Sequence, residues 1–390
     1  MKDVAYFGMI TAALEEAGIH RPSLVVDLEC LNDNLAVVEK TMTNGPAVRI
    51  VDKSLPSLPL LAHVMQRLGT NRIMSFHLPI TTAVLEAFPD AHVLFGKPMP
   101  AAAVASAFAN TDASRRRDLC DRITWLIDTP ERLAQYASLA RSLGRPLRIA
   151  FEINIGMQRG GFDTPDALAH ALTLLGEGEG LLQCEGLMGY EAHVPAIPAL
   201  FGGPGAALTS ARKSYMDFAA CLSSEQRKIL NSGGSQTALA YAGDHFINDV
   251  SIGSALLKPV DFDNPALTHL KPALFLATPV LKVQDTRLPG PSFMTPVLQA
   301  LGLFPRRGCF LYGGRFMAEP VFPQGLRRNS LWGDSSNQQL LAMPAACPLA
   351  PDDFVFFRPT QSEAVLQHFG PLQVLESGRI AHEWAVLPSG

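Results

Sequence analysis

Short apolar runs alternate with amphipathic stretches from about residue 22 to residue 260. The runs predict strands at residues 23–27, 47–53, 71–76, 91–96, 122–128, 147–154, 181–190, 228–233 and 249–253. Between them, apolar residues recur three and four positions apart, which is typical of helices. Because the runs are continuous rather than alternating, we expect strands buried on both faces, as in a parallel sheet. About eight such strand–helix units predict a (β/α)8 barrel (TIM barrel), with a doubly wound sheet as the structural alternative.

Helix boundaries within this region are marked by ordinary capping residues. Thr129 is a good N-cap with Pro130 in the first helical position, and Gly144 ends the same helix.

Residues 199–210 read ALFGGPGAALTS, and we expect a surface loop there rather than a lid.

After about residue 270 the pattern changes to strand-like runs separated by Pro and Gly turns, with no convincing helix. We therefore expect three parts. Residues 1–20 form an N-terminal segment that packs with the β domain, residues 21–270 form the barrel, and residues 271–390 form a C-terminal β domain.

Composition excludes several classes of protein. The chain is 47% hydrophobic and 17% charged, with a net charge of −4 and no long run of like charge, so neither a nucleic-acid surface nor a disordered tail is indicated. The basic run Arg115–Arg117 lies among acids and predicts a solvated helix face or turn. The acids in residues 1–20 argue against a signal peptide or a membrane span. Six scattered cysteines without metal-ligand spacing predict a reducing, cytoplasmic location.

Polar residues follow several predicted barrel strands, at the ends where the chemistry of such barrels takes place. Lys53 ends the strand VRIVDK. The others are Asp27, His77, Arg159, Tyr190 and His193. A lysine at the end of a buried strand needs a partner, because an unpaired buried ammonium group is costly. Asp52, or another acid at the rim of the barrel, would be the simplest partner.

Two Gly/Ser turns follow the last two strands. Gly233, Gly234 and Ser235 form one turn, and Gly253 with Ser254 forms the other. Adjacent backbone N–H groups and hydroxyls of this kind can bind an anion, and barrels often hold a phosphate at the loops after their late strands. A phosphate site together with a buried lysine suggests pyridoxal phosphate.

In their order, these segments resemble the fold-type III pyridoxal-phosphate enzymes, whose barrel is that of alanine racemase, and more closely the D-threonine aldolase/D-serine dehydratase family. The matching segments are RPSLVVDLECLNDNL, VRIVDKSLPSLP, FEINIGMQRGGF, GLMGYEAH, NSGGSQT, DVSIGSAL and GRIAHEWAVLPSG. No single segment is specific, but the ordered set covers residues 21–390. The resemblance implies a homodimer in which each β domain closes the partner's site.

The resemblance also implies roles for individual residues. Lys53 would hold the cofactor as an imine, Arg159 would face its ring, and Tyr190 and His193 would join Lys53 as catalytic residues. The phosphate would be held by Gly233, Gly234, Ser235, Gly253 and Ser254.

Three departures from the family pattern concern a metal site. The lysine strand lacks the histidine of the family's Arg-Pro-His-x-Lys, and the family's Glu-His pair falls on Ser336-Asn337. The family's Pro-x-His-x-Cys/Asp reads PTQSE here, with Gln361 and Glu363 at the ligand positions. A neutral amide is a poor ligand for zinc or manganese, so we expect no metal, although Glu363 could still hold a hard cation with waters. Asn337, Gln361 and Glu363 are then candidates for binding a polar substrate.

These observations predict a pyridoxal-phosphate-dependent lyase, of aldolase or dehydratase type, that acts on a small β-hydroxy amino acid of D configuration. Without a metal to polarise the β-hydroxyl, racemisation through deprotonation at Cα is the alternative. A non-enzymatic pyridoxal-phosphate carrier is a second alternative, and a barrel without cofactor, in which Lys53 is only part of a rim salt bridge, is a third.

Overall fold

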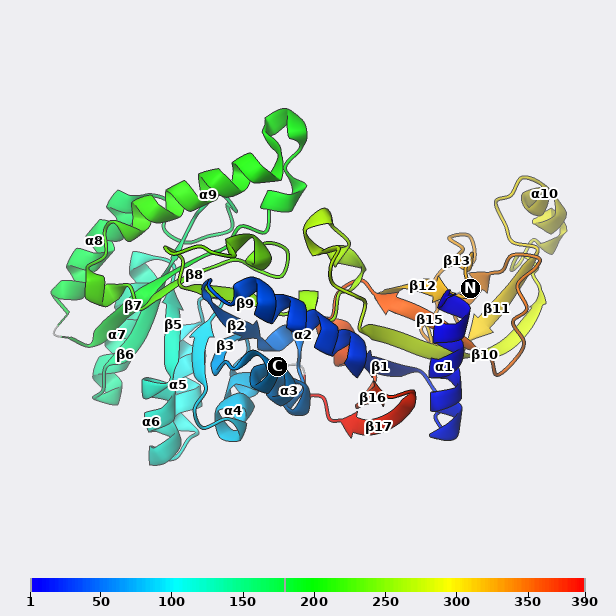
Figure 1. Ribbon diagram of the computed structural model, residues 1–390, viewed down its shortest axis with the longest axis horizontal. Helices are drawn as coiled ribbons and strands as arrows, with labels where there is room; N and C mark the ends of the chain where they lie inside the picture. The colour runs from blue at the N-terminus through cyan, green and yellow to red at the C-terminus, as the bar shows by residue number, and fades with distance from the viewer. Residues whose placement is uncertain (1, 179, 389–390) are drawn as a thin grey trace. The chain divides into compact units, whose positions relative to one another are not determined.

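The computed structural model describes residues 2–178 and 180–388. The chain divides into two compact units, which are described separately (Figure 1). The barrel unit consists of Leu35–Leu256 with Asn264–His269. The sheet unit consists of the chain up to Asn34, Leu257–Asp263 and the chain from Leu270 onward.

Eight parallel strands close into a barrel, in which β9 pairs with β2. They are β2 (Ala47–Val51), β3 (Arg72–Ser75), β4 (His92–Phe95), β5 (Ile123–Ile127), β6 (Leu147–Ile153), β7 (Leu182–Gly189), β8 (Ile229–Ser232) and β9 (Asp249–Ile252). Their residues are almost all buried, because one face fills the barrel and the other packs against helices. The predicted (β/α)8 barrel is confirmed, and the doubly wound alternative is wrong.

Helices connect these strands. They are α2 (Leu28–Met42), α3 (Leu58–Leu68), α4 (Leu78–Ala87), α5 (Ala101–Ala109), α6 (Ala113–Asp121), α7 (Pro130–Leu143), α8 (Pro165–Gly176) and α9 (Gly203–Ala219). The Thr129 hydroxyl caps α7 by accepting the N–H of Arg132, and Gly144 ends that helix in the left-handed conformation. The basic run Arg115–Arg117 lies on α6. The predicted loop at residues 199–210 is wrong for most of its length, because α9 begins at Gly203 with a proline in its first turn.

The strand β1 (Ser23–Asp27) corrects a prediction. The sequence pattern assigns it to the barrel, but it pairs antiparallel with β10 (Leu274–Asp285) and parallel with β16 (Leu372–Glu376) in the sheet unit. All five of its residues are buried. A fully buried apolar run has the same pattern in either sheet, so hydrophobicity alone could not identify its neighbours.

The sheet unit is built on nine strands. Besides β1, β10 and β16 they are β11 (Arg307–Leu311), β12 (Ala318–Phe322), β13 (Arg327–Arg328), β14 (Leu340–Ala342), β15 (Phe354–Pro359) and β17 (Arg379–Trp384). Two short helices, α10 (Thr295–Ala300) and α11 (Glu363–Leu366), interrupt the strands. The prediction of no helix after residue 270 is therefore wrong, because helices of one or two turns leave no detectable periodicity.

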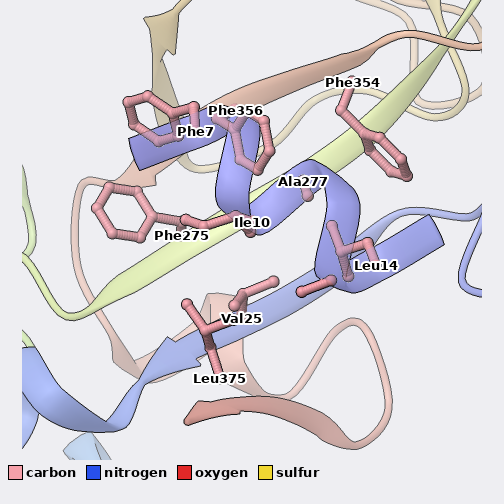
Figure 2. Packing of buried hydrophobic residues seen from close by; sticks show 10 residues of the cluster. Phe7, Ile10, Leu14, Val25, Phe275, Ala277, Phe354, Phe356 and Leu375 are labelled. Carbon is pink, nitrogen blue, oxygen red and sulfur yellow. The ribbon is translucent and has the colours of Figure 1, made fainter. Parts of the chain in front are cut away.

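The N-terminal helix α1 (Lys2–Glu16) covers this sheet with an aromatic core (Figure 2). Phe7 lies at its centre, with its ring centroid 5.4 Å from that of Phe275 and 4.8 Å from that of Phe356. Ile10 and Leu14 continue the same buried face of the helix. In the described part of the chain, no helix combines the length and the apolar character needed to cross a membrane.

Candidate active site at the carboxyl end of the barrel

Lys53 lies directly after β2, in the short 3₁₀ helix η1 (Asp52–Ser54). The carboxyl ends of parallel barrel strands meet at one mouth, so this position brings Lys53 to the same end as the loops after β7, β8 and β9. Its Nζ lies 4.4 Å from the ring centroid of Phe76, the residue that follows β3. A contact of this kind favours the ammonium group over an aromatic face and holds it at the barrel rim.

Asp52 precedes Lys53 and is fully buried. Neither of its carboxylate oxygens makes a hydrogen bond of good geometry within the described residues. Burial raises the pKa of Asp52 to about 7, although nearby Ser75 and Lys53 act in the opposite direction. The sequence suggested Asp52 as a salt-bridge partner for Lys53. With a pKa of about 7 the Asp52 carboxyl group is only partly ionised at neutral pH, which weakens such a pair.

The turn after β9 packs closely against the residues around Lys53. Ser254 donates a hydrogen bond of 3.0 Å from its Oγ to the Oγ of Ser54. A Cβ added at Gly253 would lie 2.8 Å from the Cβ atoms of both Val51 and Ser54. Glycine is therefore required where the end of β9 meets the end of β2, and the predicted phosphate turn is a neighbour of the lysine segment.

The turn after β8 is joined to the turn after β9, because Ser235 Oγ accepts the N–H of Gly253 at 3.0 Å. All three glycine N–H groups that the sequence offered as anion donors are already bonded, that of Gly253 to Ser235 as just described. Gly233 donates to Glu191 at 3.3 Å, and Gly234 donates to Thr237 Oγ1 at 3.1 Å. Within residues 2–178 and 180–388, the backbone N–H of Ser235 makes no hydrogen bond. The anion donors of this turn therefore shift from the glycines toward Ser235.

Glu191 is a buried residue that sequence reasoning missed. It accepts hydrogen bonds from Ser232 Oγ at 2.9 Å and from Thr237 Oγ1 at 2.5 Å, in addition to the Gly233 N–H. Burial raises its pKa, and these hydrogen bonds oppose the shift. Glu191 thus fixes the turn after β8 through three hydrogen bonds to its residues. A carboxylate directly after a buried strand, in the segment YEAH, was the available signal.

Arg159 and Tyr190 come together, as the sequence suggested for residues at strand ends. The guanidinium carbon of Arg159 lies 5.0 Å from the centroid of the Tyr190 ring, and one guanidinium nitrogen lies 4.0 Å from Glu152 Oε1. Tyr190 also packs against the turn after β8, since a Cβ at Gly234 would lie 2.5 Å from its ring. These contacts form a continuous wall from the loop after β6 to the loop after β8.

His193 follows β7 and packs against Gly156 of the loop after β6. A Cβ at Gly156 would lie 2.9 Å from His193 Nε2. Its Nδ1 is buried, and no hydrogen-bond partner for it is found among the described residues. An unpaired ring nitrogen of this kind is available for a ligand or a proton.

The other three predicted residues belong to the sheet unit. Asn337 is exposed in a turn, where its N–H donates to Ser335 Oγ at 3.2 Å. Gln361 is exposed before α11, and Glu363 is half-buried at the start of that helix. Among the residues that the structure describes, no three His, Cys, Asp or Glu side chains group as a metal site. A substrate-binding role for these three stays a prediction.

Comparison with known families decides the identity of the barrel. The model of the alanine racemase N-terminal domain family matches residues 26–259. The chain belongs to this family. No curated protein matches the chain.

Solved structures of alanine racemase-like proteins share the fold over both units. A D-threo-3-hydroxyaspartate dehydratase from Delftia sp. HT23 has a TM-score of 0.74 at 18% identity, covering 95% of this chain and 98% of that one. A D-threonine aldolase from Filomicrobium marinum has a TM-score of 0.72 at 15% identity, covering 93% and 94%. An alanine racemase from Bacillus anthracis, with bound L-Ala-P, has a TM-score of 0.69 at 15% identity, covering 94% and 98%. The resemblance to fold-type III pyridoxal-phosphate enzymes is thus confirmed.

Membership of the alanine racemase family implies pyridoxal phosphate, and the residues at the carboxyl mouth fit such a group. The loops at this end of the barrel supply the half-buried Lys53 and two serine-containing turns that are joined by a hydrogen bond. Glycine at the second turn lets its backbone approach the lysine segment closely. The same loops supply Arg159 and the unpaired Nδ1 of His193. Glu191 packs against the turn after β8, where it accepts hydrogen bonds from Ser232, Thr237 and Gly233.

Proposed function

We propose that this protein is a pyridoxal-phosphate-dependent lyase, of aldolase or dehydratase type, that acts on a small β-hydroxy amino acid of D configuration. Lys53 would hold the cofactor covalently, and the turns Gly233–Gly234–Ser235 and Gly253–Ser254 would form its phosphate site. The backbone N–H of Ser235 and the serine hydroxyls would be the donors there, and the glycines would let the phosphate approach closely. The protein works as a cytoplasmic homodimer, as fold-type III enzymes of this kind typically do.

One observation supports this proposal above the others. The lysine after β2 is locked to the glycine–serine turn after β9 by the Ser254–Ser54 hydrogen bond and by the close approach of Gly253. A rim salt bridge alone would not require a hydroxyl-lined turn that excludes even a Cβ. A covalent lysine and a phosphate site at adjacent strand ends are what this cofactor needs.

The bound cofactor would supply an electron sink for negative charge that develops at Cα of the substrate. The protein's own groups would then position the amino acid and move protons. Lys53 would act as the base at Cα, and His193, whose Nδ1 has no partner among the described residues, would be the candidate base for the β-hydroxyl. Arg159, held over Tyr190, provides a positive charge for a carboxylate or the cofactor ring.

Racemisation is the second candidate because of particular residues in the sheet unit. Gln361 and Glu363 replace the His and Cys/Asp of the related lyases, and Asn337 replaces a histidine. If the β-hydroxyl chemistry depends on those ligands, deprotonation and reprotonation at Cα is the reaction that Lys53 and Tyr190 could still perform.

The test is the absorption spectrum of the purified protein with pyridoxal phosphate, before and after addition of single amino acids. D-Threonine, D-serine and D-3-hydroxyaspartate should shift the visible band and yield aldehyde or ammonia with keto acid. A shift with both enantiomers of one amino acid, without breakdown, would favour the racemase. A visible band that no amino acid shifts would indicate a carrier, and no band at all would overturn the proposal.

A further inference from the structure

The opposite mouth of the barrel contains a cationic cavity that the proposed chemistry does not use. It has a volume of about 230 Å³ and is lined at the amino ends of the strands. Its charged or titratable side chains are Arg49, Arg72, His92, Arg122, Arg148, Glu185 and Lys228. Lys53 and the Gly/Ser turns lie at the carboxyl ends of the same strands, so the two sites are at opposite ends of the barrel.

Some of these cations already have structural partners. Arg49 is buried and makes two hydrogen bonds of 2.8 Å to Asp249, and its third nitrogen donates to the carbonyls of Ile73 and His92, so four of its five N–H donors are used. Arg122 donates to the backbone carbonyls of Leu85 and Ala91 at 3.0 and 3.2 Å, which fixes it in the wall. Arg49 and Arg122 therefore form part of the cavity wall, and few of their N–H groups are left to bind a ligand.

Other cations have unused hydrogen-bonding capacity. The guanidinium group of Arg148, on β6, makes no hydrogen bond or ion pair within the part of the chain that the structure describes. Arg72 contacts Asp249 through one nitrogen at 2.7 Å, and its side chain is 35% exposed. Lys228 contacts Glu185 at 3.1 Å and is 61% exposed. Donors therefore point into the same small space from β3, β6 and the start of β8.

Positive charge is in excess in this cavity, although the whole chain carries a net charge of −4. Five cationic side chains line it, and the carboxylates in contact with them are Glu185, Asp249 and Asp118, the last at 3.5 Å from Arg122. The pKa of His92 responds to these positive charges. Its pKa is lowered by burial and then by Arg148, Arg122, Arg49 and Arg72. Clustered like charges repel one another, and a bound anion would relieve that repulsion.

We propose that this cavity binds a small phosphate-bearing anion, such as pyrophosphate or a small phosphomonoester. The planar fork of an arginine matches phosphate oxygens in pairs, and Arg72 and Arg148 both offer one. The volume is smaller than the roughly 300–1,000 Å³ of pockets for drug-sized ligands, which favours a compact anion. The site is separate from the proposed cofactor site and goes beyond the proposed reaction.

The experiment is calorimetric titration of the full chain with pyrophosphate at constant ionic strength. The protein is first saturated with pyridoxal phosphate, so that the turns after β8 and β9 are occupied. Arg148→Gln should weaken pyrophosphate binding by roughly tenfold or more, and Arg148→Lys by less, because it keeps the charge and loses the fork. Arg141→Gln, on the exposed face of α7, is the matched control and should leave the affinity unchanged.

Glu185→Gln provides a second variant with the opposite sign. Removing this carboxylate frees Lys228 and should tighten pyrophosphate binding several-fold, which simple loss of structure would not do. Succinate, titrated in parallel, should bind more weakly than pyrophosphate. Absence of saturable binding to the wild-type protein would overturn the proposal. So would an affinity that responds to Ser254→Leu at the other mouth and not to Arg148→Gln.

Discussion

At the scale of single residues, Asp52 and Lys53 show how one turn of chain can hold two unlike groups. Asp52 is fully buried with a pKa raised to about 7, while the amine of Lys53 is partly exposed over the Phe76 ring. The sequence identified Lys53 because a strand-end lysine is conspicuous. It could not reveal the state of Asp52, because burial of a carboxyl group depends on which helices cover that strand end.

We expect the stability of the cofactor-free protein to depend on pH through Asp52. Its carboxyl group titrates near 3.8 when unfolded and near about 7 when folded, so the folded protein holds the extra proton between these values. Stability therefore falls as the pH rises from about 4 to about 7. Asp52→Asn should remove this loss, raising the free energy of unfolding by about 1–4 kcal/mol at pH 8 and little at pH 4. Urea denaturation at both pH values measures it, and identical pH profiles for variant and wild type would contradict it.

We also expect Lys53→Ala to lose the visible absorption band that the protein shows with pyridoxal phosphate, because the covalent link needs this amine. Lys213→Ala is the control, since Lys213 is exposed on α9 and its Nζ lies 2.8 Å from Asp217. Borohydride reduction followed by peptide mapping locates the labelled lysine. A label on any other lysine would refute the assignment.

At the scale of elements, the strand–helix alternation predicted the barrel because parallel strands are buried on both faces and leave continuous apolar runs. The same property misassigned β1, since its five buried residues do not show that β10 and β16 are its neighbours. The glycine turns were identified as sites, but their hydrogen bonds were not. Whether Gly233 donates to a ligand or to Glu191 depends on a side chain 42 residues away in the sequence.

The junction of β2 with the turn after β9 gives a prediction at this scale. Gly253→Ala places a Cβ 2.8 Å from the Cβ atoms of Val51 and Ser54, so the ends of β2 and β9 must move apart. We expect a loss of about 1–3 kcal/mol in the free energy of unfolding and weaker retention of pyridoxal phosphate. Gly176→Ala is the matched control, because its Cβ would meet nothing within 4 Å at the end of α8. Equal effects of the two substitutions would argue against a packed junction.

At the scale of the whole barrel, closure joins parts of the chain that are far apart in sequence. Arg49 of β2 and Asp249 of β9 form a buried pair across the closing strands, and Asn231 of β8 donates to the same carboxylate at 2.6 Å. Burial acts to raise the pKa of Asp249, but Arg49 and Arg72 outweigh it and hold the pKa below its ordinary value. The apolar pattern predicted a closed barrel, and this polar network shows what fixes the alignment of its first and last strands.

Breaking this pair should cost more than removing it. Arg49→Met leaves the Asp249 carboxylate buried with only Arg72 as a cationic partner, and we expect a loss of about 3–5 kcal/mol in the free energy of unfolding. The double variant Arg49→Met with Asp249→Asn should recover a substantial part, because no fully buried charge is then left unpaired; Arg72 also loses Asp249, but its side chain is 35% exposed. Urea denaturation at pH 7 measures both, with Arg141→Met on exposed α7 as the control. If the double variant were as unstable as the sum of its single substitutions, the two side chains would act independently and the strands would be aligned by their backbone pairing alone.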